Sequence, residues 1–217
     1  TIKLWNGHNG SYLNTLYGHK YWVLCVEFSP NGQLLASGSA DGTVKLWDVQ
    51  TGQLWKTLQG ETSWIWSLSF SPDGKQLATG NDDGMIQLWK IDEETVIYTL
   101  TDHSASIQSV AFHPAKNLLA SGSDDGTVGL WDTDTGRRLR WLQGHRNRVS
   151  TVAFSPSGDW LASGSVDETI RLWNVSNHDC LSVLQPERPY EGMNITGVQG
   201  LTEAQKESLK FLGAFET

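Results

Sequence analysis

The sequence is poor in the residues on which several common classes of protein depend. It has two cysteines in 217 residues, Cys25 and Cys180, which excludes a disulfide framework and a cysteine-based zinc site. Lysine and arginine number 16 against 24 aspartates and glutamates, for a formal net charge of −8. The chain therefore lacks the basic surface that nucleic-acid binding requires. No apolar run reaches the roughly eighteen residues that span a bilayer, so we expect neither a nucleic-acid nor a membrane partner.

Proline is also scarce, and no secretory signal is visible. Six prolines stand against 22 glycines, which favours many tight turns over a proline-rich disordered linker. The N-terminus, which begins at Thr1 without an initiator methionine, shows no basic segment followed by an apolar one. These absences predict a cytoplasmic globular protein.

Tryptophan, in contrast, is abundant, and its spacing reveals an internal repeat. Five of the 11 tryptophans are spaced 42 residues apart, and glycine, aspartate and phenylalanine recur with the same step. The tryptophans are Trp5, Trp47, Trp89, Trp131 and Trp173. The repeat divides the chain into a partial unit 1–17, four full units 18–59, 60–101, 102–143 and 144–185, and a tail 186–217.

Each full unit has the pattern of four short strands. In the first unit, residues 22–28 are β-branched and aromatic and end at a Ser-Pro-Asn-Gly turn, and 34–39 lead into a tight Asp-Gly hairpin. Residues 43–48 alternate, and a fourth strand runs to about Leu58. Positions 23, 26 and 28 are apolar in every unit and are expected to face inward, and their change of parity predicts a β-bulge. Four such strands make one blade, so the sequence predicts an all-β fold, a β-propeller of four-stranded antiparallel blades with a half blade at 1–17.

The segments Gly18-His19, Leu35 to Ser39 and Asp41 to Asp48 resemble the WD40 repeat. The resemblance covers residues 1–185. It implies a β-propeller that serves as a non-enzymatic platform for protein–protein interaction, with no cofactor.

The resemblance also implies a structural tetrad in each blade, a hydrogen-bonded chain of aspartate, histidine, serine or threonine, and tryptophan. The implied residues are His19, Ser37, Asp41 and Trp47 in blade 1, Thr79, Asp83 and Trp89 in blade 2, His103, Ser121, Asp125 and Trp131 in blade 3, and His145, Ser163, Asp167 and Trp173 in blade 4. Blade 2 has Glu61 in place of histidine. Two carboxylates cannot both stay buried and ionised, so we expect a broken tetrad with Glu61 turned to solvent.

Serine, histidine and aspartate together invite comparison with a hydrolase triad. The constellation occurs three times, however, and no Gly-x-Ser-x-Gly elbow accompanies it. The remaining histidines, His8, His113 and His178, occupy different repeat positions. We therefore predict no catalytic residue and no metal site.

In propellers of this family, partners usually bind the loops before the first strand and between the second and third strands. The residues predicted to bind a partner are Lys20, Trp22, Thr62, Trp64, Trp66, Asp82, Ser106, Asp124, Arg146 and Arg148. Exposed tryptophan beside arginine is typical of interaction hot spots. The alternative is that these tryptophans only pack against their neighbours. Trp55, Trp141 and Trp160 are expected to pack between blades.

Residues 1–17 match only the outer two strands of a blade, so the ring is expected to be incomplete. We expect upstream sequence to complete it, and the competing interpretation is closure between two chains through open blade edges. In the tail, Thr202 and Gln205 form a capping-box pattern that predicts a helix over about 202–212.

The segments Arg188 to Gly197 and Leu201 to Lys206 resemble a C-terminal tail found on multidomain WD-repeat and pentapeptide-repeat proteins of photosynthetic bacteria. In such proteins the propeller often follows an NTPase of the NACHT or NB-ARC type or a Ser/Thr kinase. This resemblance implies an interaction scaffold or sensor within a larger signal-transduction protein. The alternative is a regulatory domain for a catalytic part that lies upstream. No P-loop signature occurs in these 217 residues.

Overall fold

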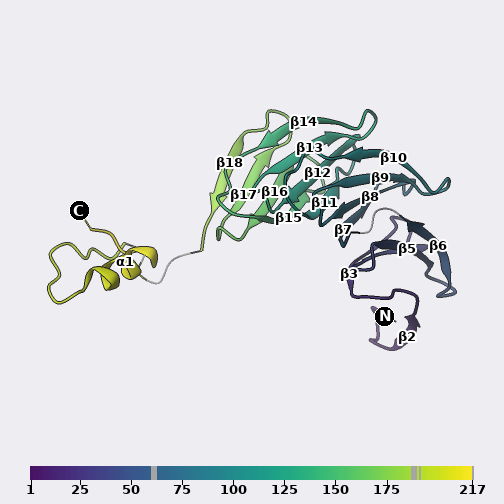
Figure 1. Ribbon diagram of the computed structural model, residues 1–217, viewed down its shortest axis with the longest axis horizontal. Helices are drawn as coiled ribbons and strands as arrows, with labels where there is room; N and C mark the ends of the chain where they lie inside the picture. Colours follow the sequence, from purple (N-terminus) through teal and green to yellow (C-terminus); the bar gives the residue numbers. More distant parts are fainter. Residues whose placement is uncertain (60–62, 187–189, 191, 217) are drawn as a thin grey trace. The chain divides into compact units, whose positions relative to one another are not determined.

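The computed structural model describes residues 1–59, 63–186, 190 and 192–216 (Figure 1). They form two compact units, Thr1–Val183 and Leu184–Thr217. The first unit consists of antiparallel sheets, one with two strands and four with four strands, each in chain order. The expected all-β fold with four-stranded blades is therefore confirmed.

We number the four-stranded sheets as blades 1 to 4 and call the two-stranded sheet the half blade. The half blade contains β1 (Ile2–Trp5) and β2 (Tyr12–Leu16). Blade 1 contains β3 (Val23–Phe28), β4 (Leu34–Ser39), β5 (Thr43–Asp48) and β6 (Leu54–Gln59). Blade 2 contains β7 (Ile65–Phe70), β8 (Gln76–Asn81), β9 (Ile86–Lys90) and β10 (Thr95–Leu100). Blade 3 contains β11 (Ile107–Phe112), β12 (Leu118–Ser123), β13 (Val128–Asp132) and β14 (Arg137–Leu142). Blade 4 contains β15 (Val149–Phe154), β16 (Trp160–Ser165), β17 (Ile170–Asn174) and β18 (Cys180–Leu184).

The first strand of every blade contains the predicted bulge. In blade 1 the pairing register of β3 with β4 shifts between Val23 and Cys25, and the equivalent shift occurs in the other three blades. Strands β3, β7, β11 and β15 are neighbours in that order, so the blades lie side by side (Figure 1). Because all four blades share this geometry, equivalent loops emerge from equivalent places.

The apolar core lies between successive blades rather than within any one of them. Val44 and Leu46 of blade 1 belong to one buried cluster with Leu68 and Phe70 of blade 2. Equivalent clusters join blade 2 to blade 3, blade 3 to blade 4, and the half blade to blade 1. Each sheet therefore buries its apolar faces only by packing against its neighbours.

Side chains on the first strands also tie each blade to the next. The backbone N–H of Phe70 donates to Glu27 Oε2 at 2.9 Å, and that of Val110 donates to Ser67 Oγ at 3.0 Å. The backbone N–H of Val152 donates to Ser109 Oγ at 3.1 Å. These bonds all span 43 residues, so one pattern of contacts recurs from blade to blade.

Positions 26 and 28 were expected to be buried in every blade, and in blade 1 this expectation is wrong. Leu68 and Val110 are 7% and 5% exposed, but the equivalent Val26 is 52% exposed and Phe28 is 53% exposed. The half blade contributes only β1 and β2, so no inner strand covers this face of β3. A cavity of about 500 Å³, lined in part by Trp5, Val26 and Phe28, lies there instead.

The opposite flank of the blades is uncovered as well. Ile86 and Val128 are fully buried under the next blade, whereas the equivalent Ile170 of blade 4 is 48% exposed. Trp160 was expected to pack between blades, and this expectation is wrong, because its side chain is 45% exposed. Its counterpart in blade 3, Leu118, is buried because blade 4 packs against it. Among the described residues of the first unit, nothing packs on blade 4 in the way that blade 4 packs on blade 3.

The second unit contains α1 (Glu203–Phe211), close to the predicted range. Thr202 is its N-cap, and Thr202 and Gln205 form the predicted capping box. Lys210 Nζ lies 2.8 Å from Glu216 Oε2, an ion pair that links the end of the helix to the C-terminal residues. No helix in the described residues is both long and apolar enough to cross a membrane.

Candidate functional site

The structure brings the tetrad side chains together in blades 1, 3 and 4. In blade 1, His19 Nδ1 lies 3.0 Å from Asp41 Oδ2, and His19 Nε2 lies 2.8 Å from Ser37 Oγ. The indole N–H of Trp47 donates to the same Ser37 Oγ at 2.8 Å. The equivalent distances in blades 3 and 4 are between 2.7 and 3.0 Å. Trp47 donates to the serine oxygen, so that hydroxyl can donate to His19 Nε2 while His19 Nδ1–H donates to the carboxylate.

Electrostatics fix the charge state of this chain of bonds. Burial alone would raise the pKa of Asp41, but hydrogen bonds from the Thr43 hydroxyl, the Lys20 backbone and His19 hold it well below its ordinary value. Burial also lowers the pKa of His19. The aspartate is therefore ionised and the imidazole neutral at pH 7, the arrangement in which every group has a partner.

This geometry suits a structural role and is unsuited to catalysis. Ser37, Ser121 and Ser163 are each fully buried, so no substrate can reach their hydroxyls. Each serine oxygen also accepts a hydrogen bond from a tryptophan, which occupies a lone pair that nucleophilic attack would use. The same buried hydrogen-bond network thus stabilises blades 1, 3 and 4.

In blade 2, only part of the tetrad is present among the described residues. The indole N–H of Trp89 donates to Thr79 Oγ1 at 3.1 Å. The side chain of Asp83 is exposed and has no hydrogen bond within the described part of the chain. Glu61, expected to point to solvent, lies outside the described residues. Among the described residues, the tetrad of blade 2 thus has one side-chain hydrogen bond, whereas those of blades 1, 3 and 4 have three.

Among the residues predicted to bind a partner, three tryptophans form a contiguous group, which we call the tryptophan cluster (Trp22, Trp64 and Trp66). The rings of Trp22 and Trp64 meet edge to face with centroids 6.2 Å apart, and those of Trp64 and Trp66 are 5.7 Å apart. Trp22 is 70% exposed and Trp64 is 41% exposed. The rings therefore contact one another across blades 1 and 2 and still present a large aromatic surface.

One backbone hydrogen bond recurs at the same loop position in all four blades. The N–H of Ala40 donates to Trp22 O, and that of Asp82 donates to Trp64 O. In blades 3 and 4 the corresponding bonds join Asp124 to Ser106 and Val166 to Arg148. The face defined by these loops, which we call the loop face, thus carries the predicted residues of all four blades that the structure describes.

Polar side chains complete the central part of the loop face. Trp66 Nε1 donates to Asp82 Oδ1 at 2.8 Å, so this tryptophan and this carboxylate form a fixed pair. Ser106 was predicted to bind a partner but is buried, and its hydroxyl accepts a bond from Gln108 Nε2 at 3.1 Å. Gln108 was not predicted, although it occupies the repeat position of Trp66 and could have been found there.

The remaining predicted residues differ in how accessible they are. Lys20, Arg146 and Arg148 are exposed, and none of them forms an ion pair among residues 1–59 and 63–186. Asp124 is half-buried. Thr62 lies outside the described residues. Tyr21, which was not predicted, is 70% exposed beside Trp22 and extends the aromatic surface.

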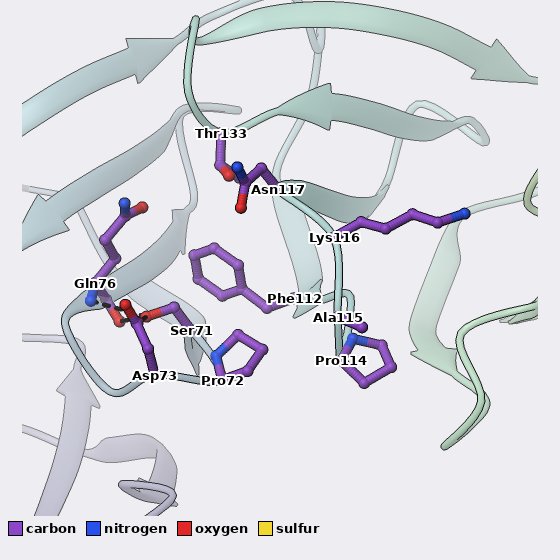
Figure 2. Close-up of a pocket in the computed structure, with 10 residues that line it drawn as sticks. All are labelled: Ser71, Pro72, Asp73, Gln76, Phe112, Pro114, Ala115, Lys116, Asn117 and Thr133. Carbon is purple, nitrogen blue, oxygen red and sulfur yellow. Dashed lines mark hydrogen bonds between the residues drawn. The ribbon is translucent and has the colours of Figure 1, made fainter.

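A smaller pocket lies at the opposite ends of the strands, between the β7–β8 and β11–β12 loops (Figure 2). It measures about 190 Å³, and the ring of Phe112 lies near its centre with Pro72 and Pro114 beside it. Ligand pockets usually enclose roughly 300–1,000 Å³, so this one is small for a ligand. We find no group of three metal-ligating side chains among the described residues.

One carboxyl on an inner strand makes the stability of the blades depend on pH. Burial raises the pKa of Glu27 from 4.5 to about 7. Between these values the folded chain holds a proton that the unfolded chain has lost, so the free energy of unfolding falls as the pH rises. Glu27→Gln should therefore stabilise the protein at pH 8 by about 1–2 kcal/mol, after allowance for solvent screening, and less at pH 5.

Urea denaturation at the two pH values would measure this difference. Glu168→Gln is the matched control, because Glu168 is exposed on the β16–β17 turn, and it should change stability equally little at both. A gain from Glu27→Gln that is no larger at pH 8 than at pH 5 would show that Glu27 is not a neutral carboxyl in the folded protein.

Comparison with known proteins adds to this geometry. The family described as WD domain, G-beta repeat matches residues 10–48, 52–90, 94–132 and 136–174. Each match begins near the last strand of one sheet and ends in the third strand of the next. The sequence repeat is thus staggered against the sheets, and each repeat spans two neighbouring ones.

Two curated relatives match short segments of the chain. An uncharacterized WD repeat-containing protein of Nostoc sp. is 64% identical over 33 residues, 15% of this chain. Apoptotic protease-activating factor 1 of Danio rerio is 46% identical over 43 residues, 20% of this chain. These matches span only 2% and 3% of the relatives' own lengths.

Proposed function

Because the chain belongs to the WD40 repeat family, we propose that it is a protein-interaction module that binds its partner through the loop face. Domains of this family generally act as non-catalytic interaction platforms. In this proposal the partner contacts the loop face, with the tryptophan cluster at the centre of the interface.

The observation that carries this proposal is the exposure of Trp22. A tryptophan that is 70% exposed leaves a large apolar surface in water, and burying such surface is the main favourable term in protein association. Trp22 also contacts Trp64 of the next blade, so the ring is held in place before a partner arrives. A preorganised aromatic anchor loses little conformational freedom on binding.

We propose further that the module is non-enzymatic and works as a scaffold or sensor in a larger signalling-type protein. The full burial of the tetrad serines supports the first part. The second part is supported by the likeness to apoptotic protease-activating factor 1. If the module instead regulates an NTPase or a kinase, the loop face would still be the surface that binds.

The test compares two exposed tryptophans, one on the loop face and one away from it. Proteins captured by the whole chain from extract of its source cells would be identified, and their affinity measured by calorimetry. Trp22→Ala should weaken binding by at least about thirtyfold, as expected for a hot-spot residue. Trp55→Ala is the control, because Trp55 is 44% exposed on β6, away from the loop face.

Both variants should melt within about 2 °C of the wild type, since exposed side chains contribute little to stability. Equal loss of affinity in Trp22→Ala and Trp55→Ala would place the interface elsewhere. A large drop in the melting temperature of Trp22→Ala would instead show that the cluster belongs to the core.

A further inference from the structure

The loop face carries a charge pattern that specifies what the partner presents to it. Its exposed basic side chains belong to blade 1, with Lys20, and to blade 4, with Arg146 and Arg148. Blades 2 and 3 carry Asp82 and Asp124 at equivalent positions. The two equivalent aspartates thus belong to the central blades and the cations to the outer ones, and blade 4 also carries the exposed Glu168 on its β16–β17 turn.

The carboxylates of blades 2 and 3 lie along one continuous stretch of the face. Asp82 is bonded to Trp66, and the turn that follows it reaches blade 3, where a Cβ built on Gly84 would lie 2.8 Å from Ala105 O. The next residue, Ser106, accepts the backbone N–H of Asp124 at 2.9 Å. Trp66, Asp82 and Asp124 therefore lie around the junction of the two blades.

Asp124 is held at this junction with an unsatisfied acceptor. Its Oδ1 is buried and has no hydrogen-bond partner among the described residues. An unpaired buried carboxylate oxygen is unfavourable in the free protein. Oδ1 is closed to solvent, so a donor from a partner reaches it only when this half-buried side chain rotates, and a hydrogen bond formed there would relieve the penalty.

Asp82 differs from Asp124 in that one of its oxygens is already satisfied. Oδ1 accepts the indole N–H of Trp66, and the side chain forms no ion pair within the described part of the chain. The bond fixes the carboxylate beside an indole ring. The carboxylate lies at the N–H edge of the ring, so a cation placed over the ring face is attracted by the quadrupole of the ring and by the nearby negative charge.

We propose that the partner presents an arginine side chain to the junction of blades 2 and 3, where Trp66 offers its ring and Asp82 and Asp124 offer carboxylate oxygens. A guanidinium group has five N–H donors in one plane and stacks on aromatic rings, which a lysine ammonium does less well. The carboxylates of Asp82 and Asp124 can accept these N–H donors, and the indole of Trp66 offers a ring on which the guanidinium can stack. This inference rests on the proposed function, since it concerns the same face.

The test uses NMR of the whole chain, in which the indole N–H resonances of the 11 tryptophans can be followed individually. The resonance of Trp66 would be assigned from Trp66→Phe. The probe is a capped pentapeptide, Gly-Gly-Arg-Gly-Gly, and its control has citrulline, the neutral counterpart of arginine of nearly the same shape. We expect the arginine peptide to shift the Trp66 resonance and to bind at least about tenfold more tightly than the citrulline peptide.

Substitutions of single aspartates distinguish binding of the peptide at this site from general electrostatic attraction to an acidic protein. Asp82→Asn and Asp124→Asn should each weaken binding of the arginine peptide by about three- to tenfold. Asp159→Asn removes the same charge from an exposed loop at the opposite ends of the strands and should change it less than twofold. If one aspartate variant fails to fold, the other variant and the citrulline comparison decide.

Equal binding of the two peptides, or equal effects of all three aspartate substitutions, would overturn the arginine site. The outcome for the proposed function is read separately. If Trp22→Ala abolishes partner binding while the arginine peptide leaves Trp66 unshifted, the loop face is the interface and arginine is the wrong chemistry. If the peptide binds and Trp22→Ala has no effect, the site stands and the larger interface does not.

Discussion

Ser121→Ala is expected to lower the free energy of unfolding by about 2–5 kcal/mol, far more than the loss of one hydroxyl on the surface would. Ser121 is fully buried, and its oxygen lies 2.7 Å from His103 Nε2 and 2.8 Å from Trp131 Nε1. Alanine would leave both ring nitrogens buried and without that partner. Each unsatisfied buried group costs about 1–3 kcal/mol.

Blade 2 offers the matched comparison for this substitution. Thr79 occupies the same position, and its hydroxyl has one described side-chain partner, Trp89, at 3.1 Å. Thr79→Val keeps the shape of the side chain and strands one donor, so the expected loss is about 1–2 kcal/mol. Urea denaturation of both variants would give the two values. A loss from Thr79→Val as large as that from Ser121→Ala would mean that the histidine bond contributes nothing to stability.

Gly80→Ala is expected to destabilise the protein by about 1–3 kcal/mol through overpacking, because the space its side chain needs is already filled. A Cβ on Gly80 would lie 2.4 Å from Cγ2 and 2.9 Å from Cβ of Ile107. Ile107 belongs to the first strand of blade 3 and is fully buried. The methyl group would therefore push blade 2 away from blade 3.

The same substitution in blade 4 is the control. A Cβ on Gly164 would meet only Thr151 Cγ2, at 3.0 Å, and Thr151 is exposed and free to yield. Gly164→Ala should change the stability by less than about 0.5 kcal/mol. Thermal and urea denaturation of the pair would check this contrast. Similar losses in both variants would show that the glycine is required by the strand itself and not by the next blade.

The repeated positions explain which parts of the fold could be predicted from the sequence. A 42-residue period with a fixed turn and a fixed hairpin specifies four strands per unit, because strand and turn preferences act locally. The same reasoning placed the bulge, since the parity of apolar residues depends only on the strand itself. These local signals suffice for the blades.

The exposure of Val26 and Phe28 could not be predicted in this way. Comparing repeats treats equivalent positions as having equivalent surroundings, and Val26 resembles Leu68 in every local respect. Its burial depends on a neighbouring inner strand that the half blade does not contain. Burial in a repeat protein is thus a property of the interface between units and not of the unit.

The candidate site shows the same division. The tryptophans of the loop face were found because they depart from the repeat pattern at equivalent positions. Asp82 and Ser106 were predicted as separate partner-binding residues, but their bonds to Trp66 and Gln108 join side chains through space and do not follow from the spacing. The burial of Ser106 likewise depends on its surroundings, which the spacing does not specify.

The bonds that tie one blade to the next also have a consequence for the order in which the chain can fold during synthesis. Each of them joins a residue to one 43 positions later, so no such contact waits for a distant part of the polypeptide. A ribosome that has released one blade needs to release only one more unit before the first finds its neighbour. Contacts this local favour rapid folding and leave each apolar face unprotected for the time taken to translate a single repeat, a few seconds at about 5–20 residues per second.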